Sequence, residues 1–224
     1  MSKILIVGGS KGIGKKISEI LENKECIVFS RNNVDSPNSN HHYYNLDINN
    51  DDFPEIEDLS SIIYCPGTIN LKPFRSLKEE DFLNDFKVNL LGAVRVIKHY
   101  LKTLSKSPNA SIILFSTVAV KQGMSFHASI SSAKGALEGL TKSLAAEFAG
   151  KIRVNCIAPT LTNTPLAEGI LRNEEAIERS NARHPSKRIN NVDDVANTAV
   201  FLLESNNITG QIIGVDGGLS TLKV

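Results

Sequence analysis

Short apolar runs alternate along the chain with longer segments in which apolar residues recur every three or four positions. The runs predict strands at 3–7, 26–29, 43–46, 62–65, 111–115, 152–157 and 211–215. The recurring positions predict helices at 13–21, 82–104, 133–148 and 195–203. Strands that alternate with helices are typical of a parallel sheet covered on both faces. We therefore predict a single doubly wound α/β domain, a Rossmann fold, over residues 1–224.

The connection after the second predicted strand breaks this alternation. Residues 31–42 are rich in Asn and Ser, contain Pro37 and show no apolar periodicity. A parallel crossover helix needs both more residues and such a period, so we expect no helix there. The next connection, 47–60, is also short and predicts a turn or two at most. This shortened crossover leaves the sheet thinly covered at its second and third strands.

Composition and charge exclude several classes of partner. Apolar residues make up 41% of the chain and charged residues 22%, and the formal net charge is +1, so no global field attracts nucleic acid or an anionic membrane. Cys26, Cys65 and Cys156 lack metal-type spacing and are interpreted as buried thiols in a reducing compartment. With no apparent signal peptide or membrane-length apolar run, we expect a cytoplasmic protein without a metal site.

A glycine-rich turn joins the first strand to the first helix. Gly8, Gly12 and Gly14 have the spacing G-x-x-x-G-x-G, with Ser10, Lys11 and Ile13 between them. Glycine permits a tight turn and lets the backbone approach a pyrophosphate, which the helix N-terminus then stabilises. A glycine cluster alone is a weak signal, but its position between a strand and a helix favours a dinucleotide-binding loop.

The end of the second strand indicates which dinucleotide is bound. An acidic residue there would bind a ribose 2′-hydroxyl and favour NAD, but this chain has Ser30 and Arg31. Arg31 can pair with a 2′-phosphate, and Lys11 adds a second cation, although both residues could be solvated surface charges. We therefore expect NADPH or NADP as the cofactor in preference to NAD.

Further motifs, in the same order along the chain, resemble those of the short-chain dehydrogenase/reductase family. They are the glycine loop, Asp47 after the third strand, Gly67, Asn89 in V-N-L-L-G, Thr117, Lys134, the segment Pro159-Thr160 to Thr164, and the tail from Ile208 to Gly218. Departures include Val7 for a threonine, Tyr64-Cys65-Pro66 where the family has N-N-A, and Thr160 for a glycine. The resemblance covers nearly the whole chain and implies a Rossmann fold and an oxidoreductase activity.

The resemblance also implies roles for individual residues. Asp47 would contact the adenine, Lys134 the nicotinamide ribose and Thr164 the nicotinamide carboxamide, while Asn89 would anchor a water chain and Thr117 steady the substrate oxygen. At position 130, where the family has the tyrosine that donates a proton, this chain has isoleucine. Because general acid catalysis is typically worth about 10²–10⁴-fold, ordinary carbonyl reduction should be slowed by that order unless another group substitutes.

Several groups near position 130 could replace the tyrosine. His127 lies three residues earlier, and imidazole is a side chain suited to proton transfer at neutral pH, although a surface or capping histidine is the commoner role. Ser129 and Ser131 should turn away from the shared face and bond to the backbone. Lys134 could act through a water molecule.

Apolar residues are expected to form the substrate wall, although the same pattern could be plain core packing. They are Val118, Met124, Phe126, Leu161 and Leu166, and we name residues 162–185 the lid segment. We expect hydride transfer to a small hydrophobic carbonyl or activated alkene. The helices from Phe82 and Ala133 resemble those that form family dimers and tetramers, so we expect a homodimer or homotetramer. The alternative is a catalytically impaired NADPH-binding protein that acts as a sensor or assembly partner.

Overall fold

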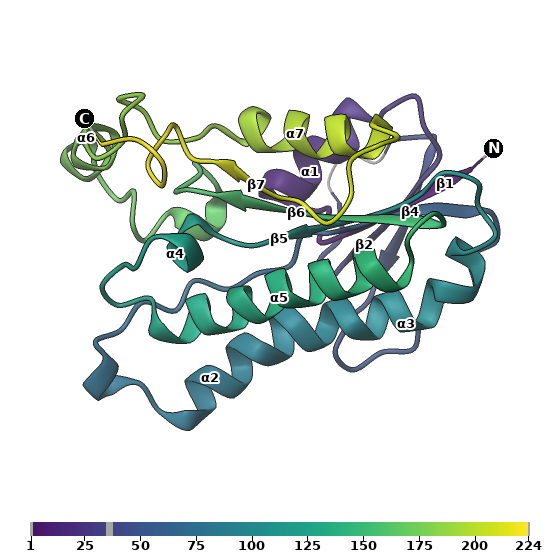
Figure 1. The fold of residues 1–224 in the computed structure, drawn as a ribbon, viewed down its shortest axis with the longest axis horizontal. Helices are drawn as coiled ribbons and strands as arrows, with labels where there is room; N and C mark the ends of the chain where they lie inside the picture. Colours follow the sequence, from purple (N-terminus) through teal and green to yellow (C-terminus); the bar gives the residue numbers. More distant parts are fainter. Residues whose placement is uncertain (1, 35–37, 224) are drawn as a thin grey trace.

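Seven parallel strands form one sheet in the order β3-β2-β1-β4-β5-β6-β7, which confirms the predicted doubly wound α/β fold (Figure 1). The computed structural model describes residues 2–34 and 38–223. The strands are β1 (Lys3–Val7), β2 (Cys26–Ser30), β3 (His41–Asn45), β4 (Leu59–Tyr64), β5 (Ala110–Phe115), β6 (Ile152–Pro159) and β7 (Ile212–Val215). The chain order reverses at β1, which pairs with both β2 and β4. Ligands of such sheets bind at this kind of switch point.

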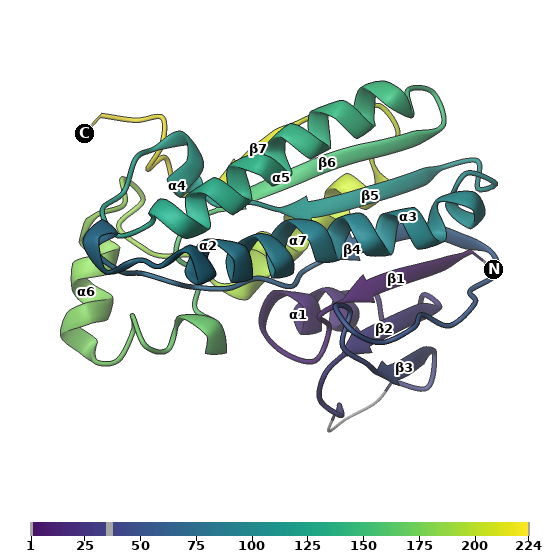
Figure 2. The same cartoon turned by 90° about the horizontal axis from the view of Figure 1, so that it is seen from below.

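Helices cover both faces of the sheet (Figures 1 and 2). One face carries α1 (Gly12–Ile20) and α7 (Val192–Glu204), and the other carries α3 (Gly92–Leu104) and α5 (Ala128–Glu147). The remaining elements are η1 (Phe74–Ser76), α2 (Glu79–Phe86), η2 (Lys87–Leu91), α4 (Val118–Lys121), η3 (Pro165–Ala167) and α6 (Glu174–Ala182). Within the described ranges, no helix combines the length and apolar character needed to cross a membrane.

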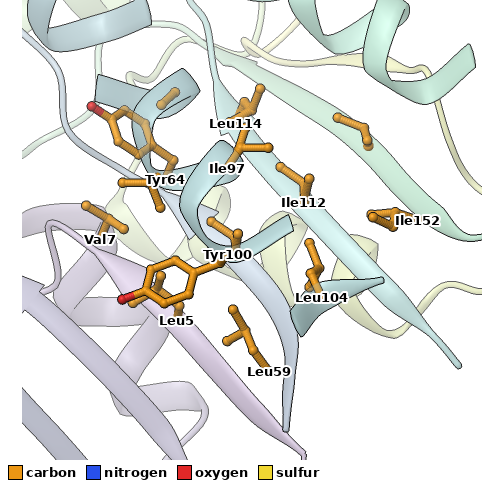
Figure 3. Close-up of a cluster of buried hydrophobic side chains, with 14 of the residues drawn as sticks. Leu5, Val7, Leu59, Tyr64, Ile97, Tyr100, Leu104, Ile112, Leu114 and Ile152 are labelled. Carbon is orange, nitrogen blue, oxygen red and sulfur yellow. The ribbon is translucent and has the colours of Figure 1, made fainter. Parts of the chain in front are cut away.

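Each central strand contributes to two separate cores because its side chains alternate between the two faces. In β1, Leu5 and Val7 pack with Tyr100 and Leu104 of α3 (Figure 3), whereas Ile6 packs against Ile17 of α1. Both sets are almost fully buried. This two-sided burial explains why the strands appear in the sequence as continuous apolar runs.

The shortened crossover is replaced by side-chain packing. No helix occurs in 31–34 or 38–40, while Pro37 lies outside the described residues, and a turn after β3 stands in place of the second helix. Phe53 from that connection stacks on Phe29 and Tyr100, and Arg95 lies over its ring at 4.5 Å. Tyr100 also donates to the Pro54 carbonyl at 2.7 Å. These contacts cover β2, whereas much of β3 remains exposed.

Several element bounds differ from those predicted. The helix expected at 82–104 begins at Glu79 and contains the π-type turn η2, since the chain there accommodates an extra residue per turn. The fourth strand begins at Leu59, because pairing with β1 draws Ser60 and Ser61 into the sheet despite their polarity. The helix expected from Ala133 begins at Ala128.

Phe53→Ala should lower the free energy of unfolding by about 2 kcal/mol, because it removes half-buried aromatic contacts that stand in for a missing helix. Chemical denaturation measures this change. Phe74→Ala is the matched control, since Phe74 is 76% exposed and should leave stability unchanged. Equal effects of the two substitutions would show that the aromatic cluster does not stabilise this edge.

Candidate functional site

A cavity of about 920 Å³ opens where β4, β5 and β6 end. Its walls bring together predicted residues that are far apart in the chain, namely Ile13, Gly67, Thr117, His127, Ile130, Lys134, Pro159, Thr160 and Thr164. The five predicted wall residues Val118, Met124, Phe126, Leu161 and Leu166 also line it. The volume and the mixture of apolar walls with a few polar groups are typical of a small-molecule site.

The glycine loop has a backbone that only glycine adopts easily. Gly8 has φ +81° and Gly12 has φ +54°, both in the left-handed region. A Cβ on Gly14 would collide with the Gly8 carbonyl oxygen, so helix α1 can begin this close to β1 only with glycine there. The loop, which includes Ser10, is therefore a tight turn that leads directly to Ile13 in the cavity wall, and such a turn fits a dinucleotide pyrophosphate.

The predicted adenosine contacts form a polar edge outside the cavity. Ser30 is buried and donates to the Asn32 carbonyl at 2.5 Å, whereas Lys11 and Arg31 are exposed. The Asp47 carboxylate accepts from the Asn49 backbone N–H at 3.0 Å, and this bond is the main reason that its pKa is lowered. The charge of Arg31 lowers that pKa further, so Arg31 and Asp47 share this edge.

Asn89 lies in the π-type turn η2 and is fully buried behind the cavity. Its Nδ2 donates to Thr68 Oγ1 at 2.9 Å and to the Asp85 carbonyl at 2.8 Å. Its Oδ1 has no partner in the described part of the chain. A Cβ on Gly67 would lie 3.5 Å from both this Oδ1 and Lys134 Nζ. Both polar groups therefore lie beside Gly67, and the absence of a side chain at this glycine leaves them uncrowded.

A buried carboxylate adjoins Asn89 and was not anticipated from the sequence. Asp85 is 2% exposed and accepts hydrogen bonds from Thr68 Oγ1 at 2.5 Å and from Ser129 Oγ. Ser129 thus faces away from the cavity, and Ser131 bonds to the His127 carbonyl at 2.6 Å. The available signal was the four-residue spacing of Asp85 and Asn89, which puts both on one helix face.

Lys134 is a buried cation at the base of the cavity. Its Nζ donates to the Phe115 carbonyl at 2.7 Å. Burial lowers its pKa to about 8, and the nearby Cys156, Cys65 and Asp85 oppose that shift. Thr117 lies next to it at the start of α4, where Oγ1 accepts from the Ala119 N–H at 3.3 Å. The Thr117 hydroxyl hydrogen is therefore free to be donated to a substrate oxygen.

Ile130 lies in the cavity wall four residues before Lys134 on α5. His127, at the start of the same helix, is half-buried and its Nδ1 bonds to the Ser125 carbonyl at 2.7 Å. Because a carbonyl only accepts, Nδ1 carries a proton, and in the neutral ring Nε2 carries the lone pair.

A second histidine in the cavity was missed by sequence reasoning. His184 is 3% exposed, its Nδ1 bonds to the Ser180 carbonyl at 2.8 Å and its Nε2 lies 2.8 Å from Thr160 Oγ1. In the neutral ring Nδ1 therefore donates to the Ser180 carbonyl, and Nε2 accepts a hydrogen bond from the Thr160 hydroxyl. The threonine at position 160 thus has a buried partner, although the two residues are far apart in the sequence.

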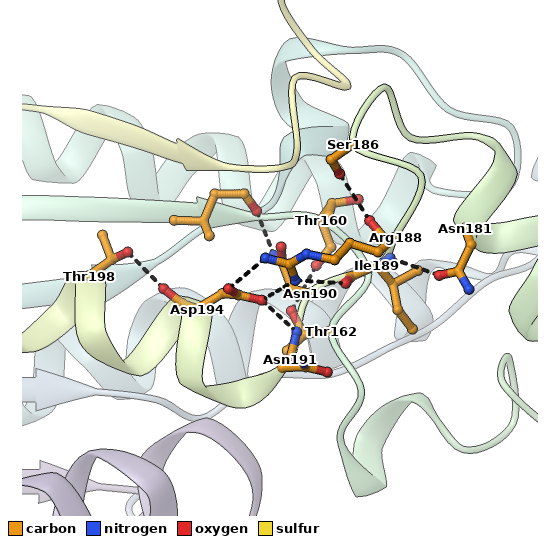
Figure 4. Close-up of polar contacts among 11 residues, drawn as sticks. Thr160, Thr162, Asn181, Ser186, Arg188, Ile189, Asn190, Asn191, Asp194 and Thr198 are labelled. Carbon is orange, nitrogen blue, oxygen red and sulfur yellow. Dashed lines mark hydrogen bonds and ion pairs between the residues drawn. The ribbon is translucent and has the colours of Figure 1, made fainter.

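The start of the lid segment is bonded to the chain that follows its end (Figure 4). Thr162 forms a β-bridge with Asn190, and the Asn190 side chain donates to the Val215 carbonyl at 2.6 Å. Arg188 contacts the Asp194 carboxylate with two bonds of 2.6 and 2.9 Å at the start of α7. Residues between these anchors, including η3 and α6, supply one wall of the cavity.

The chain matches a known family over most of its length. The family model described as Enoyl-(Acyl carrier protein) reductase matches residues 54–220. The chain belongs to the short-chain dehydrogenase/reductase family. It is 33% identical to carbonyl reductase family member 4 of Danio rerio, with 99% of this chain and 100% of the relative covered. It is 31% identical to the 3-oxoacyl-[acyl-carrier-protein] reductase of Bos taurus, with 98% of each chain covered.

Solved structures of the short-chain dehydrogenase/reductase family share the fold. Thermoplasma acidophilum aldohexose dehydrogenase aligns with a TM-score of 0.90 at 25% identity, covering 99% of this chain and 95% of that one. A tyrosine-to-phenylalanine variant of ElxO with NADPH bound aligns with a TM-score of 0.87 at 27% identity, covering 99% of both. The chain is therefore an oxidoreductase of the short-chain dehydrogenase type whose neighbours bind a nicotinamide cofactor.

Binding of NADPH at about pH 9 should be accompanied by proton uptake, because the buried Lys134 is then mostly neutral and an anionic cofactor favours its charged form. Calorimetry in buffers with different ionisation enthalpies measures the uptake. At about pH 6, where Lys134 is already protonated, this contribution should vanish. Lys134→Met should abolish the uptake at high pH, and an unchanged uptake in that variant would assign the proton to another group.

Proposed function

We propose that this protein transfers a hydride from NADPH to a small, hydrophobic carbonyl or activated-alkene substrate, with an altered proton donor. The observation that carries the proposal is the single cavity that joins Lys134 and Thr117 to an apolar wall beside the glycine loop. The buried Asn89 behind it supports the same function, because its Oδ1, which has no partner among the described residues, and Lys134 Nζ both lie beside Gly67.

In this proposal each group of residues has a separate task. When bound, NADPH supplies the hydride. The glycine loop and the start of α1 bind the pyrophosphate, Lys134 binds the nicotinamide ribose, and Thr164 binds the carboxamide. Thr117 donates a hydrogen bond to the substrate oxygen as negative charge develops on it. The residues 162–185 act as a lid over the substrate, in one domain spanning 1–224.

Ile130 occupies the position of the missing tyrosine and cannot donate a proton. His127, which lines the cavity, is one candidate donor, and water held by Lys134 is the other. His184 also lines the cavity, but in its neutral ring the one N–H already bonds to the Ser180 carbonyl. Reduction of an activated double bond demands less of this group, since the charge that follows hydride addition is delocalised.

The alternative function is that of an NADPH-binding sensor or assembly partner without turnover. It is favoured by the composition of the cavity, since none of the four tyrosines of the chain, all in the described residues, lines it. Retention of Thr117 and Lys134 in the cavity favours catalysis instead. In either case we propose a cytoplasmic homodimer or homotetramer without nucleic-acid or membrane partners.

NADPH should bind at least about ten-fold more tightly than NADH, because Arg31 and Lys11 are exposed cations at an edge that has no acid at positions 30–34. Arg31→Ala should remove most of that preference, as measured by calorimetry with both cofactors. Arg75→Ala, at an exposed position on η1, is the control and should leave it unchanged. Equal affinity of the unmodified protein for the two cofactors would contradict the assignment.

Ile130→Tyr should create or raise carbonyl reduction by roughly 10²–10⁴-fold, because it restores a hydroxyl on the face of α5 that carries Lys134. The measurement is NADPH oxidation with a panel of ketones, aldehydes and enones. Ile130→Phe is the matched control, since it adds the ring without the hydroxyl and should bring no such gain.

The remaining outcomes separate the candidate roles. A variant with tyrosine that binds NADPH yet stays inactive would mean that the site has diverged beyond residue 130. In the protein with Ile130, loss of turnover in His127→Gln would identify His127 as the donor, and unchanged turnover would favour water held by Lys134. Binding of NADPH without turnover of any compound in the panel would favour the sensor.

A further inference from the structure

The charges that line the cavity all have one sign. Lys134, Arg179 and Arg183 contribute side chains to its wall, together with the two histidines. None of the residues that line it, all within the described chain, is an aspartate or a glutamate. The chain as a whole is nearly neutral, with a formal net charge of +1, so this distribution is local. When the charged side chains of a cleft are all cationic and its other walls are apolar, the cleft attracts anions.

The cationic and the acidic residues of helix α6 lie on different sides of the helix. Residues 179, 180, 183 and 184, on its last turn and just beyond, face the cavity as one stripe. Glu174, Glu175 and Glu178 lie on the same helix but do not line the cavity. Figure 2 shows α6, which belongs to the lid segment, beyond the ends of the strands. The helix therefore presents its cations, and not its carboxylates, to the site.

Among the described residues, Arg179 and Arg183 have no ion-pair partner that would give them a structural role. Within the described residues neither forms an ion pair of 4 Å or less, even though Glu175 stands four residues before Arg179, the favourable order for a helical pair. Other arginines do have such roles, since Arg153 bonds to two carbonyls at the end of α7 and Arg188 holds Asp194. The two guanidinium groups on α6 remain available to a ligand.

We propose that the substrate carries an oxyanion group, a carboxylate or a phosphate, which Arg179 and Arg183 bind at the mouth of the cavity. A guanidinium group fits either oxyanion with two parallel hydrogen bonds. The reacting carbon lies deeper, near Thr117 and Ile130, and apolar residues such as Met124 and Ile170 enclose the part of the substrate in between. This inference names the substrate class of the proposed function and rests on it.

The test uses three aromatic probes of similar size on the whole protein saturated with NADPH. Benzoate, phenyl phosphate and uncharged benzamide are titrated by calorimetry. We expect at least one of the anions to bind ten-fold or more tightly than benzamide, roughly the worth of one charge-assisted contact. The tighter of the two anions distinguishes a carboxylate from a phosphate substrate. The preference should shrink as salt is added.

Substitutions in the lid segment provide matched controls. Arg179→Gln and Arg183→Gln should each weaken binding of the preferred anion by about ten-fold and leave benzamide unchanged. Arg172→Gln removes an exposed charge from the same segment at a position that does not line the cavity, so anion binding should be retained. NADPH affinity should be the same in all three variants.

Equal binding of the charged and neutral probes, or no binding of either anion, would overturn the inference. It would also be overturned if Arg172→Gln weakened anion binding as much as the other two substitutions. If Arg179→Gln weakened NADPH binding, the arginine would serve the cofactor, and the inference would again be overturned. Because these measurements give binding constants, they are independent of turnover. Anion binding without any NADPH oxidation would contradict only the proposed activity. Turnover of neutral substrates without anion binding would contradict only this inference.

Discussion

The parallel pairing of β1 with β4 is the constraint on which the site depends. Val7 is in register with Tyr64, and the Cys65 N–H bonds to the Val7 carbonyl at 3.0 Å. The glycine loop and the segment through Gly67 therefore leave the sheet side by side, so closely that a Cβ on Gly8 would lie 3.2 Å from the Pro66 nitrogen. Because all strands point the same way, the chain that follows β5 and β6 reaches this edge too.

Burial of Lys134 is the main electrostatic consequence of that convergence. Placing an ammonium group in the interior is costly, which explains why its pKa falls to about 8 although thiols and Asp85 lie near it. The buried Asp85 is satisfied by hydroxyl groups from Thr68 and Ser129, and the π-type turn sets Asn89 beside them. The interior behind the cavity is thus polar and hydrogen-bonded, whereas Val118, Met124, Phe126, Leu161 and Leu166 give the cavity an apolar wall. Such asymmetry suits a reaction in which charge develops at one end of a substrate.

Departures from the family pattern are related to one another in space. Ile130 removes a hydroxyl from the cavity, while Thr160 adds one that pairs with the buried His184. The lid segment that carries His184 also carries Arg179 and Arg183 on the same stripe of α6. The changes at positions 130 and 160 therefore alter the polarity of one shared space, which the two arginines also line.

The sequence by itself determined the fold class, the glycine loop and the approximate positions of the strands along the chain, because these depend on local periods and short motifs. It also indicated the missing crossover helix, since residues 31–42 have no apolar face to bury. Only the tertiary structure decided that Asp85 is buried, that Thr160 meets His184 and that α6 turns its arginines toward the cavity. Each of these depends on contacts between residues separated by tens of positions or on the rotation of a helix against the sheet. Such contacts leave no periodic trace in the chain, because side chains become neighbours only after the strands have paired and the helices have packed.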